Sequence, residues 1–336
     1  MRIGTLAAFA VSTACGSSGS VTDGNGAGSA DAPAAGEHTL SDDHPGDIGL
    51  GADPAVVWFE DFEEASVAAV TARYNDSAGA TRMQLVPDHV GGQAALALTA
   101  GGAVSAVHVY KQLPNHDELY VRWYVKYQAG VLWHHSGVWF GGYNPSTMFP
   151  NPQAGLRPNG GDRFSISVEP VYNVGAASPR FDFYNYWMTM HSWMPAPITD
   201  DGTAYYGNAL VHRDDFTIDE GQWVCLEVHA RLNPSPASGA GAVLEVWKND
   251  VQVARFDDAA PLGYWIRDKF CTMAGSASEC TSYPAPFDTK LDLQFRSNIA
   301  LALDAFWPQN YITDPTMGTL TFDQMVVATA RVGCIR

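Results

Sequence analysis

The sequence predicts an all-β protein folded as a sandwich or a jelly roll, and three observations support this. Many short segments alternate apolar and polar residues, as in ELYVRWYVKYQ at residues 118–128. Turns containing Gly, Asn or Asp separate these segments at short intervals. The spacing of apolar residues that marks amphipathic helices is nearly absent. Many short strands with frequent turns are typical of two packed β-sheets.

The candidate strands follow one another without a second linker-like segment, so residues 55–336 are predicted to form one domain. Asn249 and Asp250 lie between two alternating runs, which predicts a tight hairpin turn. The predicted strands occupy residues 55–63, 94–100, 103–113, 118–128, 137–143, 163–173, 180–190, 222–233, 242–256, 290–300 and 318–333.

The first 54 residues have a different character. Arg2, the short apolar run IGTLAAFAVSTA and Cys15 are typical of an export signal at residues 1–15. STACGSSGS resembles a bacterial lipoprotein lipobox with Cys15 as the lipidated residue, and a plain secretory signal is the alternative. Residues 16–54 are rich in Gly, Ser, Ala and Asp and contain no Lys or Arg, which predicts a disordered, dispensable tether. We therefore expect an exported protein, either a cell-envelope lipoprotein that touches a membrane only through its lipid or a secreted protein.

The charge and the aromatic content restrict the partners. A formal net charge of −17 repels phosphate backbones, which argues against nucleic acid. A polyanionic substrate would need a local cationic pocket to bind. Aromatic residues make up 12% of the chain, and they suit both a sandwich core and the stacking of sugar rings. We expect a monomer that acts on polysaccharide.

Four cysteines remain if Cys15 carries lipid, and four allow three pairings in an oxidising compartment. The segment between Cys271 and Cys280 is rich in Ser, Gly and Ala and bends easily, so we predict that these two cysteines pair. Cys225 and Cys334 would then form the second disulfide. The cysteine and histidine spacings do not match those of a zinc site, so no metal ligand set is predicted.

Several segments together resemble a known group of exported proteins. GQWVCLEVHARLN and the hairpin after it are similar to part of the concanavalin-type lectin-like domains. LTFDQMVVATARVG resembles the last strand of the jelly-roll polysaccharide lyases. LYVRWYVKYQAG, GVWFGGYNP and AGLRPNGGDRFSISV look like segments of the alginate and glucuronan lyases in that group. The resemblance covers most of residues 56–334 and implies a concanavalin A-like jelly-roll β-sandwich with lyase activity.

Other enzyme classes have less support. In WFEDFEEA, Glu60 and Glu64 would share one face of a strand, but the central acid that a retaining glycosidase of the laminarinase type requires is missing from that face. These acids, together with Asp323, could instead hold a structural Ca²⁺. The sequence has no GxSxG motif for a serine hydrolase and no glycine-rich loop that opens a helix for a nucleotide.

A uronate lyase neutralises the substrate carboxylate, removes the C5 proton and protonates the leaving oxygen. In the lyases of the group, a lysine on a strand of the concave face carries out much of this chemistry. This chain has Val138 and Trp139 at the corresponding positions. Histidines and tyrosines nearby have suitable chemistry, and Arg, Asn, Tyr and Trp side chains could bind the sugar. The catalytic candidates are His134, His135, Tyr184, Tyr186, His191 and His212, and the substrate-binding candidates are Arg157, Arg163, Tyr205, Tyr206, Asn208 and Trp139.

We predict that the functional face is concave and is built from residues 132–142, 163–169 and 181–191, with the loop at 205–213 over it. Tyr184 and Tyr186 are two residues apart, so on a strand both point to that face. Arg163 is predicted to neutralise the carboxylate. The sequence thus favours a polysaccharide lyase acting on uronate-containing glycans. A non-catalytic carbohydrate-binding protein is the first alternative, and a structural surface lipoprotein is the second.

Overall fold

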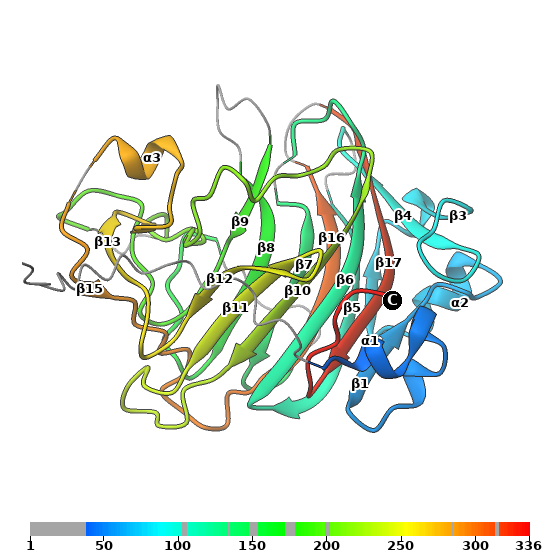
Figure 1. Cartoon of the computed structure of the whole chain (residues 1–336), viewed down its shortest axis with the longest axis horizontal. Helices are drawn as coiled ribbons and strands as arrows, with labels where there is room; N and C mark the ends of the chain where they lie inside the picture. Colours follow the sequence, from blue (N-terminus) through cyan, green and yellow to red (C-terminus); the bar gives the residue numbers. More distant parts are fainter. Residues whose placement is uncertain are drawn as a thin grey trace, which may run out of the picture. The chain divides into compact units, whose positions relative to one another are not determined.

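The computed structural model describes residues 38–102, 106–133, 135–147, 154–171, 179–198, 202–283, 285–312 and 316–336. His134 and Cys15 lie outside these residues. Within them, antiparallel sheets dominate, as the alternating segments predict (Figure 1). The strands are β1 (Val56–Glu60), β2 (Asp76–Ala78), β3 (Met83–Val86), β4 (Ala95–Ala100), β5 (Ala106–His116), β6 (Glu118–Tyr127), β7 (Gly137–Tyr143), β8 (Arg163–Val171), β9 (Arg180–Phe183), β10 (Trp223–Arg231), β11 (Val243–Lys248), β12 (Val251–Phe256), β13 (Leu262–Ile266), β14 (Lys269–Thr272), β15 (Thr289–Lys290), β16 (Leu303–Tyr311) and β17 (Gly318–Ala328).

The helices are short. They are α1 (Leu40–Asp43), η1 (Pro45–Asp47), η2 (Leu50–Ala52), α2 (Val67–Thr71), η3 (Ala80–Arg82) and α3 (Ser278–Thr281). None of the helices in the described residues has the length and apolar character needed to cross a lipid bilayer.

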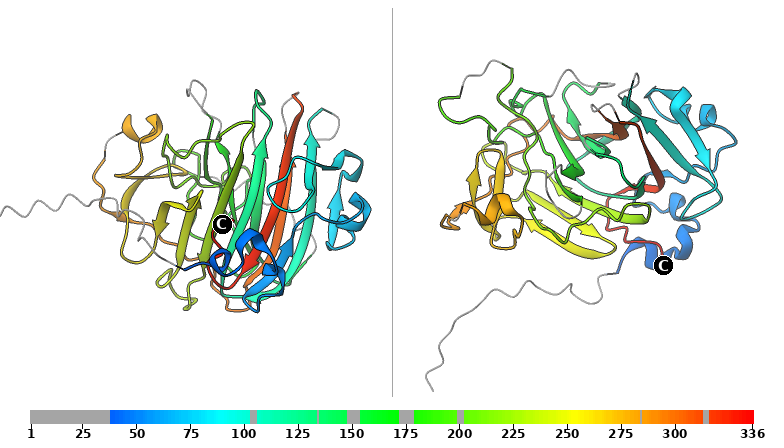
Figure 2. Two further views of the ribbon diagram at one scale, coloured as in Figure 1. Left: turned by 45° about the vertical axis from the view of Figure 1, so that its right-hand side comes forward. Right: turned by 90° about the horizontal axis from the view of Figure 1, so that it is seen from above.

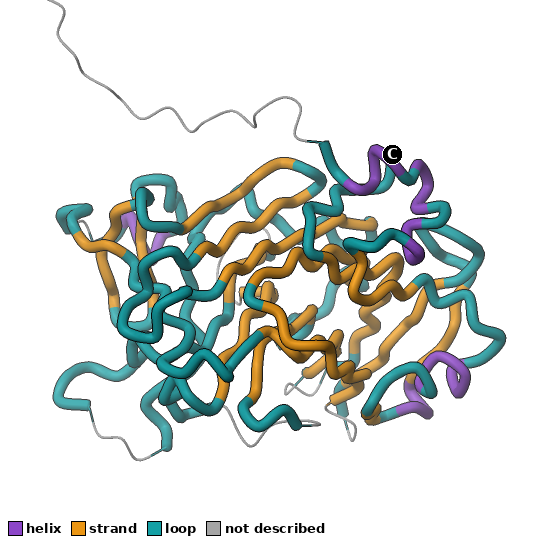
Figure 3. The backbone as a smooth tube through the Cα atoms, turned by 90° about the horizontal axis from the view of Figure 1, so that it is seen from below, coloured by secondary structure: helices purple, strands orange, loops and turns teal. Residues whose placement is uncertain are grey.

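Two large sheets form the sandwich. The first has eight strands in the order β12-β11-β10-β6-β17-β4-β3, with β1 also paired to β17. The second has six strands in the order β2-β5-β16-β7-β8-β9. The two layers are seen from above in Figure 2 and from below in Figure 3. This arrangement confirms the predicted jelly-roll sandwich.

Contacts between the sheets show which face of the six-stranded sheet is internal. The Asn310 side chain of β16 donates to the carbonyls of Leu98 at 2.7 Å and Gly318 at 2.9 Å, on β4 and β17 of the other sheet. The rings of Tyr127 on β6 and Phe181 on β9 meet at 5.5 Å. Successive residues of a strand point to opposite faces. Residues one position away from Asn310 and Phe181 in these strands therefore point to the outer face.

The local predictions for β6 and for the β11–β12 hairpin are confirmed. Along β6, alternate residues such as Val121 and Trp123 are fully buried between the sheets. Asn249 and Asp250 both have positive φ, 51° and 63°, as a tight turn matched to the twist of a hairpin requires.

The predicted tether of residues 16–54 is wrong for its last part. Residues 38–54, called here the N-terminal segment, fold into α1, η1 and η2 and pack on the domain. Leu50 is buried in a cluster with Val326 and Val332. The Asp47 carboxylate forms an ion pair with Arg122 on the outer face of β6, and both side chains are buried. A buried leucine, a buried ion pair and hydrogen bonds to the C-terminal residues hold a segment whose composition predicts disorder.

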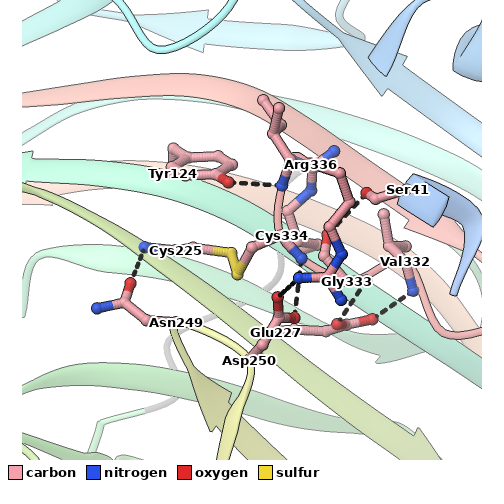
Figure 4. The surroundings of a disulfide bond; sticks show 12 residues. Ser41, Tyr124, Cys225, Glu227, Asn249, Asp250, Val332, Gly333, Cys334 and Arg336 are labelled. Atoms are coloured by element: carbon pink, nitrogen blue, oxygen red, sulfur yellow. Dashed lines mark hydrogen bonds and ion pairs between the residues drawn. A yellow bond between two sulfur atoms is a disulfide. The ribbon is translucent and has the colours of Figure 1, made fainter. Parts of the chain in front are cut away.

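Both predicted disulfides are present, Cys225–Cys334 and Cys271–Cys280. Figure 4 shows that the first one ties the C-terminal tail, residues 329–336, to β10. Beside it, the buried Glu227 carboxylate accepts hydrogen bonds from the backbone N–H groups of Val332 at 2.7 Å and Gly333 at 3.0 Å. The tail in turn holds the N-terminal segment, because Ser41 Oγ donates to the Gly333 carbonyl at 3.0 Å. The second disulfide closes the loop between β14 and α3, beside the small sheet β14-β13-β15.

Candidate active site on the outer face of the six-stranded sheet

The strand register places one row of predicted residues together. Trp139 on β7 lies opposite Trp307 on β16 and opposite Ser167 on β8. Tyr184 N donates to the Ser167 carbonyl at 2.9 Å, which continues the row beyond β8. Trp307 lies three residues before Asn310, so it is on the other face of β16, away from the eight-stranded sheet. This row, which comes from the segments at 132–142, 163–169 and 181–191, is therefore on the outer face of the six-stranded sheet.

His135 lies at the start of this row, and its imidazole is held by a carboxylate. Its Nδ1 is 3.0 Å from Glu169 Oε2, and the other oxygen of Glu169 accepts a hydrogen bond from Ser167 Oγ at 3.2 Å. Glu169 is buried, while 19% of the His135 side chain is exposed. When Nδ1–H donates to the carboxylate, the neutral imidazole carries its basic lone pair on Nε2.

The backbone around His135 is fixed by the next residue. The Ser136 carbonyl accepts from the Tyr127 hydroxyl at 2.8 Å, and Ser136 Oγ donates to Asn310 Oδ1 at 2.9 Å. From β16, Gln309 donates to the His135 carbonyl at 3.4 Å, and the Tyr311 ring is 5.9 Å from the imidazole. His135 is thus supported from the core and from the neighbouring strand.

The two predicted tyrosines meet beside His135. The Tyr184 ring lies 4.9 Å from the imidazole in an edge-to-face contact, and the Tyr186 hydroxyl donates to the Tyr184 hydroxyl at 3.4 Å. Burial raises the pKa of Tyr184 to about 12 and raises the pKa of Tyr186 further. Both phenols therefore keep their protons at neutral pH.

Gly207 closes the other side of the Tyr184 ring. A Cβ at this position would lie 2.4 Å from ring carbons of Tyr184, which is too close for any residue other than glycine. The phenol is therefore held between the imidazole and a loop backbone that only glycine permits.

The Trp139 ring packs against both tyrosines. Its ring is 5.8 Å from Trp307, 5.8 Å from Tyr184 and 6.4 Å from Tyr186. Trp139 and Trp307 are both buried, so their faces are covered by protein. Trp139 was predicted to contact substrate, but the structure gives it a packing position under the tyrosine pair.

His212 and Asn208 have structural positions, which corrects their predicted roles. His212 is buried, with Nδ1 at 3.0 Å from Glu279 and Nε2 at 3.1 Å from the Ala209 carbonyl. The fully buried Asn208 side chain accepts from the His191 N–H at 2.7 Å and donates to the His191 carbonyl at 2.8 Å. The polar side-chain atoms of both residues form hydrogen bonds that hold loops in place.

Arg163 is on the predicted face, but its charge is already matched. Its guanidinium pairs with Asp162 at 2.7 Å and donates to the Leu156 carbonyl at 3.3 Å. Arg157 is exposed and lies over the buried Tyr205 ring at 5.1 Å. Within the described residues, no carboxylate pairs with Arg157. Arg157 is therefore a better candidate than Arg163 for binding a substrate carboxylate.

The remaining predicted residues lie in the loops that follow β9. The exposed His191 stacks on Trp265 with ring centres 3.9 Å apart, and Tyr206 lies 6.2 Å from Trp193. Gly207, next to Tyr206, contacts the Tyr184 ring, so this loop borders the His135–Tyr184 pair.

Sequence reasoning missed Glu169, although the signal was present. In RFSISVEPV every second residue from Arg163 to Glu169 is polar or charged, and this alternation puts Glu169 on the same face as Ser165 and Ser167. Only the three-dimensional register shows that it reaches His135, which lies 34 positions earlier in the chain.

The acidic cluster at the first strand has its own cation. Arg73 Nη1 donates to Glu60 at 2.8 Å and also contacts Glu64. Asp323 accepts backbone hydrogen bonds from Val90 at 2.6 Å and Gly91 at 3.1 Å. Asp323 is thus bound to backbone amides and is not grouped with Glu60 and Glu64, so the Ca²⁺ site considered from the sequence does not include Asp323.

Solved structures with a similar fold include alginate lyases. Alginate lyase Aly36B is 11% identical and has a TM-score of 0.53 over 84% of this chain and 99% of that chain. A variant of Aly36B in complex with an alginate tetrasaccharide is also 11% identical, with a TM-score of 0.52 over 82% and 95%. The PL-14 alginate lyase from Aplysia kurodai is 12% identical, with a TM-score of 0.50 over 82% and 99%. No known family profile matches the sequence, and no curated protein matches it. The chain has the jelly-roll fold of these polysaccharide lyases.

Proposed function

We propose that this protein is a polysaccharide lyase that cleaves uronate-containing glycans by β-elimination. The observation that carries the proposal is the His135–Tyr184 pair, with a carboxylate-bound imidazole and a protonated phenol whose ring centres are 4.9 Å apart. Elimination needs a base and an acid on neighbouring atoms of one sugar link, and this pair supplies both.

In the proposed reaction, Nε2 of His135 takes the proton from C5 of the uronate. The electron pair left on C5 forms the C4–C5 double bond, and the C4–O bond to the leaving sugar breaks. The Tyr184 hydroxyl gives its proton to the leaving oxygen. Glu169 holds the Nδ1–H tautomer and stabilises the imidazolium that forms. No water is added, and the product carries the new double bond.

The Tyr186 hydroxyl has a positioning role in this proposal. The Tyr186 O–H donates a hydrogen bond to the Tyr184 oxygen. The Tyr184 hydrogen is therefore directed away from Tyr186 and is available for the leaving group. The same hydrogen bond stabilises the phenolate that remains after proton transfer.

The substrate carboxylate is assigned to Arg157 and Gln309. Arg157 is exposed and has no carboxylate partner among the described residues. Gln309 is partly exposed beside His135 and carries amide donors. Arg157 supplies a local positive charge in a chain whose net charge of −17 is otherwise unfavourable for an acidic polymer.

The fold supports this proposal, since the similar solved structures include alginate lyases and one of them is a complex with an alginate tetrasaccharide. Two disulfides fit the expected location outside the cytoplasm, because such bonds persist in oxidising compartments.

The test is incubation of the purified protein with polymannuronate, polyguluronate and glucuronan, with the ultraviolet absorbance of the unsaturated product followed over time. The proposal predicts a steady rise with at least one polymer. Calorimetric binding of a polymer with no rise for any of them would favour the alternative of a non-catalytic carbohydrate-binding protein. Neither binding nor product would contradict both.

A further inference from the structure

A pair of exposed aromatic side chains lies next to the candidate active site. Trp193 is 41% exposed, the largest exposed fraction among the ten tryptophans, and Tyr206 is 36% exposed. Their ring centres are 6.2 Å apart, with the planes inclined by 58°. We call these two residues the aromatic pair. Large apolar rings exposed together on a surface mark a site for a ligand or a partner.

The aromatic pair is held rigidly by polar contacts of its own loops. The Trp193 indole N–H donates to the Thr203 carbonyl at 2.8 Å, and Ser192 Oγ donates to the Ala204 carbonyl at 2.6 Å. The buried Asn208 side chain fixes the backbone of His191 and donates to the Tyr206 carbonyl at 3.3 Å. The rings are therefore set in place before a ligand arrives, which lowers the entropy cost of binding.

The aromatic pair is continuous with the proposed catalytic centre. Tyr206 directly precedes Gly207, whose backbone packs against the Tyr184 ring. Adjacent Cα atoms are about 3.8 Å apart, so the backbone of Tyr206 lies directly beside the loop position that packs against Tyr184. On the same pair of loops, Gly155 forms a backbone bridge with Tyr205, and Arg157 lies over the Tyr205 ring.

We propose that the aromatic pair is a subsite that binds a pyranose ring of the acidic polysaccharide beyond the sugars that react. The inference rests on the proposed function, because it takes the same polymer as the ligand. The flat ring faces pack on the C–H face of the sugar, and the Tyr206 hydroxyl is available to its oxygen atoms. The subsite makes the enzyme prefer long chains to short ones.

The test measures binding in a background without turnover. The Tyr184→Phe variant, with and without Trp193→Ala, is titrated by calorimetry with mannuronate and glucuronate oligosaccharides of three and six units. We expect Trp193→Ala to weaken binding of the longer oligosaccharide by about tenfold, which corresponds to the loss of roughly 1.4 kcal/mol from the aromatic contact. Binding of the trisaccharide should change little. Trp193→Phe keeps a ring and should recover most of the loss.

Tyr283→Ala is the matched control, because Tyr283 is an exposed aromatic residue beside the Cys271–Cys280 loop. It should leave binding of both lengths unchanged. Equal loss for three and six units, or unchanged binding of six units in Trp193→Ala, would overturn the subsite and leave the proposed function intact. Absence of binding for every oligosaccharide in the Tyr184→Phe protein would contradict the proposed function and the subsite together.

Discussion

The Asp47–Arg122 ion pair predicts a large loss of stability when Asp47 is replaced by Asn. Arg122 is fully buried, and its Nε and Nη1 atoms have no hydrogen-bond partner among the described residues, so Asp47 is the main group that balances its charge. The substitution keeps the size of the side chain but leaves a buried guanidinium without its carboxylate. Breaking a buried ion pair in this way costs about 3–5 kcal/mol.

Two neighbours place the expected value at the lower end of that range. The Arg122 guanidinium lies 5.3 Å from the centre of the Tyr124 ring, and it interacts electrostatically with the buried Glu227 carboxylate. Both continue to stabilise the cation in the variant. We therefore expect a loss of about 3 kcal/mol, which corresponds to a fall in Tm of roughly 10 °C for a domain of this size.

The assay is thermal and urea unfolding followed by circular dichroism. Asp43→Asn is the control, because Asp43 is in the same segment but is exposed and pairs only with the exposed His38. It should shift the free energy of unfolding by less than about 0.5 kcal/mol. Equal stability of Asp47→Asn and wild type would refute the reasoning. So would a protein beginning at residue 55 that unfolds at the wild-type temperature.

Three further predictions follow from the packing. Gly207→Ala should reduce turnover at least tenfold, because the new Cβ lies 2.4 Å from the Tyr184 ring and displaces it; an unchanged kcat would show that the ring position is unimportant. Burial raises the pKa of Asp323 to about 7, so between about pH 4 and 7 the native state holds a proton that the unfolded state has released, and stability falls as the pH rises through this window. Asp323→Asn should remove that part of the pH dependence in urea titrations, and parallel profiles for the two proteins would contradict it. Cys225→Ser should lower stability by about 4 kcal/mol, since the Cys225–Cys334 bond spans 109 positions, and a Tm insensitive to this change would count against the tail as a stabilising element.

Local patterns predicted the parts of the fold that depend on local geometry. The period of two placed Tyr184 and Tyr186 on one face, and the Asn249–Asp250 turn followed from its own residues. The flexible segment between Cys271 and Cys280 was enough to indicate the short disulfide. In each case the deciding residues are close in sequence.

The rest depends on pairings between distant residues. The Glu169–His135 contact needs the register of β7 with β8, and it spans 34 positions. His212 has the chemistry of a catalytic residue, but Glu279, 67 positions away, makes it structural. Composition also averages over a segment, so the low apolar content of residues 16–54 concealed the anchoring contact of Asp47.

The most direct test of the central claim is the rate of unsaturated product formation by Tyr184→Phe, measured beside wild type on whichever polymer wild type cleaves. The variant keeps the ring that packs against Gly207 and loses only the hydroxyl, so its fold should be retained and its affinity for substrate should change little. Loss of the proton donor should reduce kcat by about a hundredfold or more. Tyr283→Phe, at an exposed tyrosine, should match wild type. Full activity in the folded Tyr184→Phe variant would contradict the assignment of Tyr184 as the acid and, with it, the proposed mechanism.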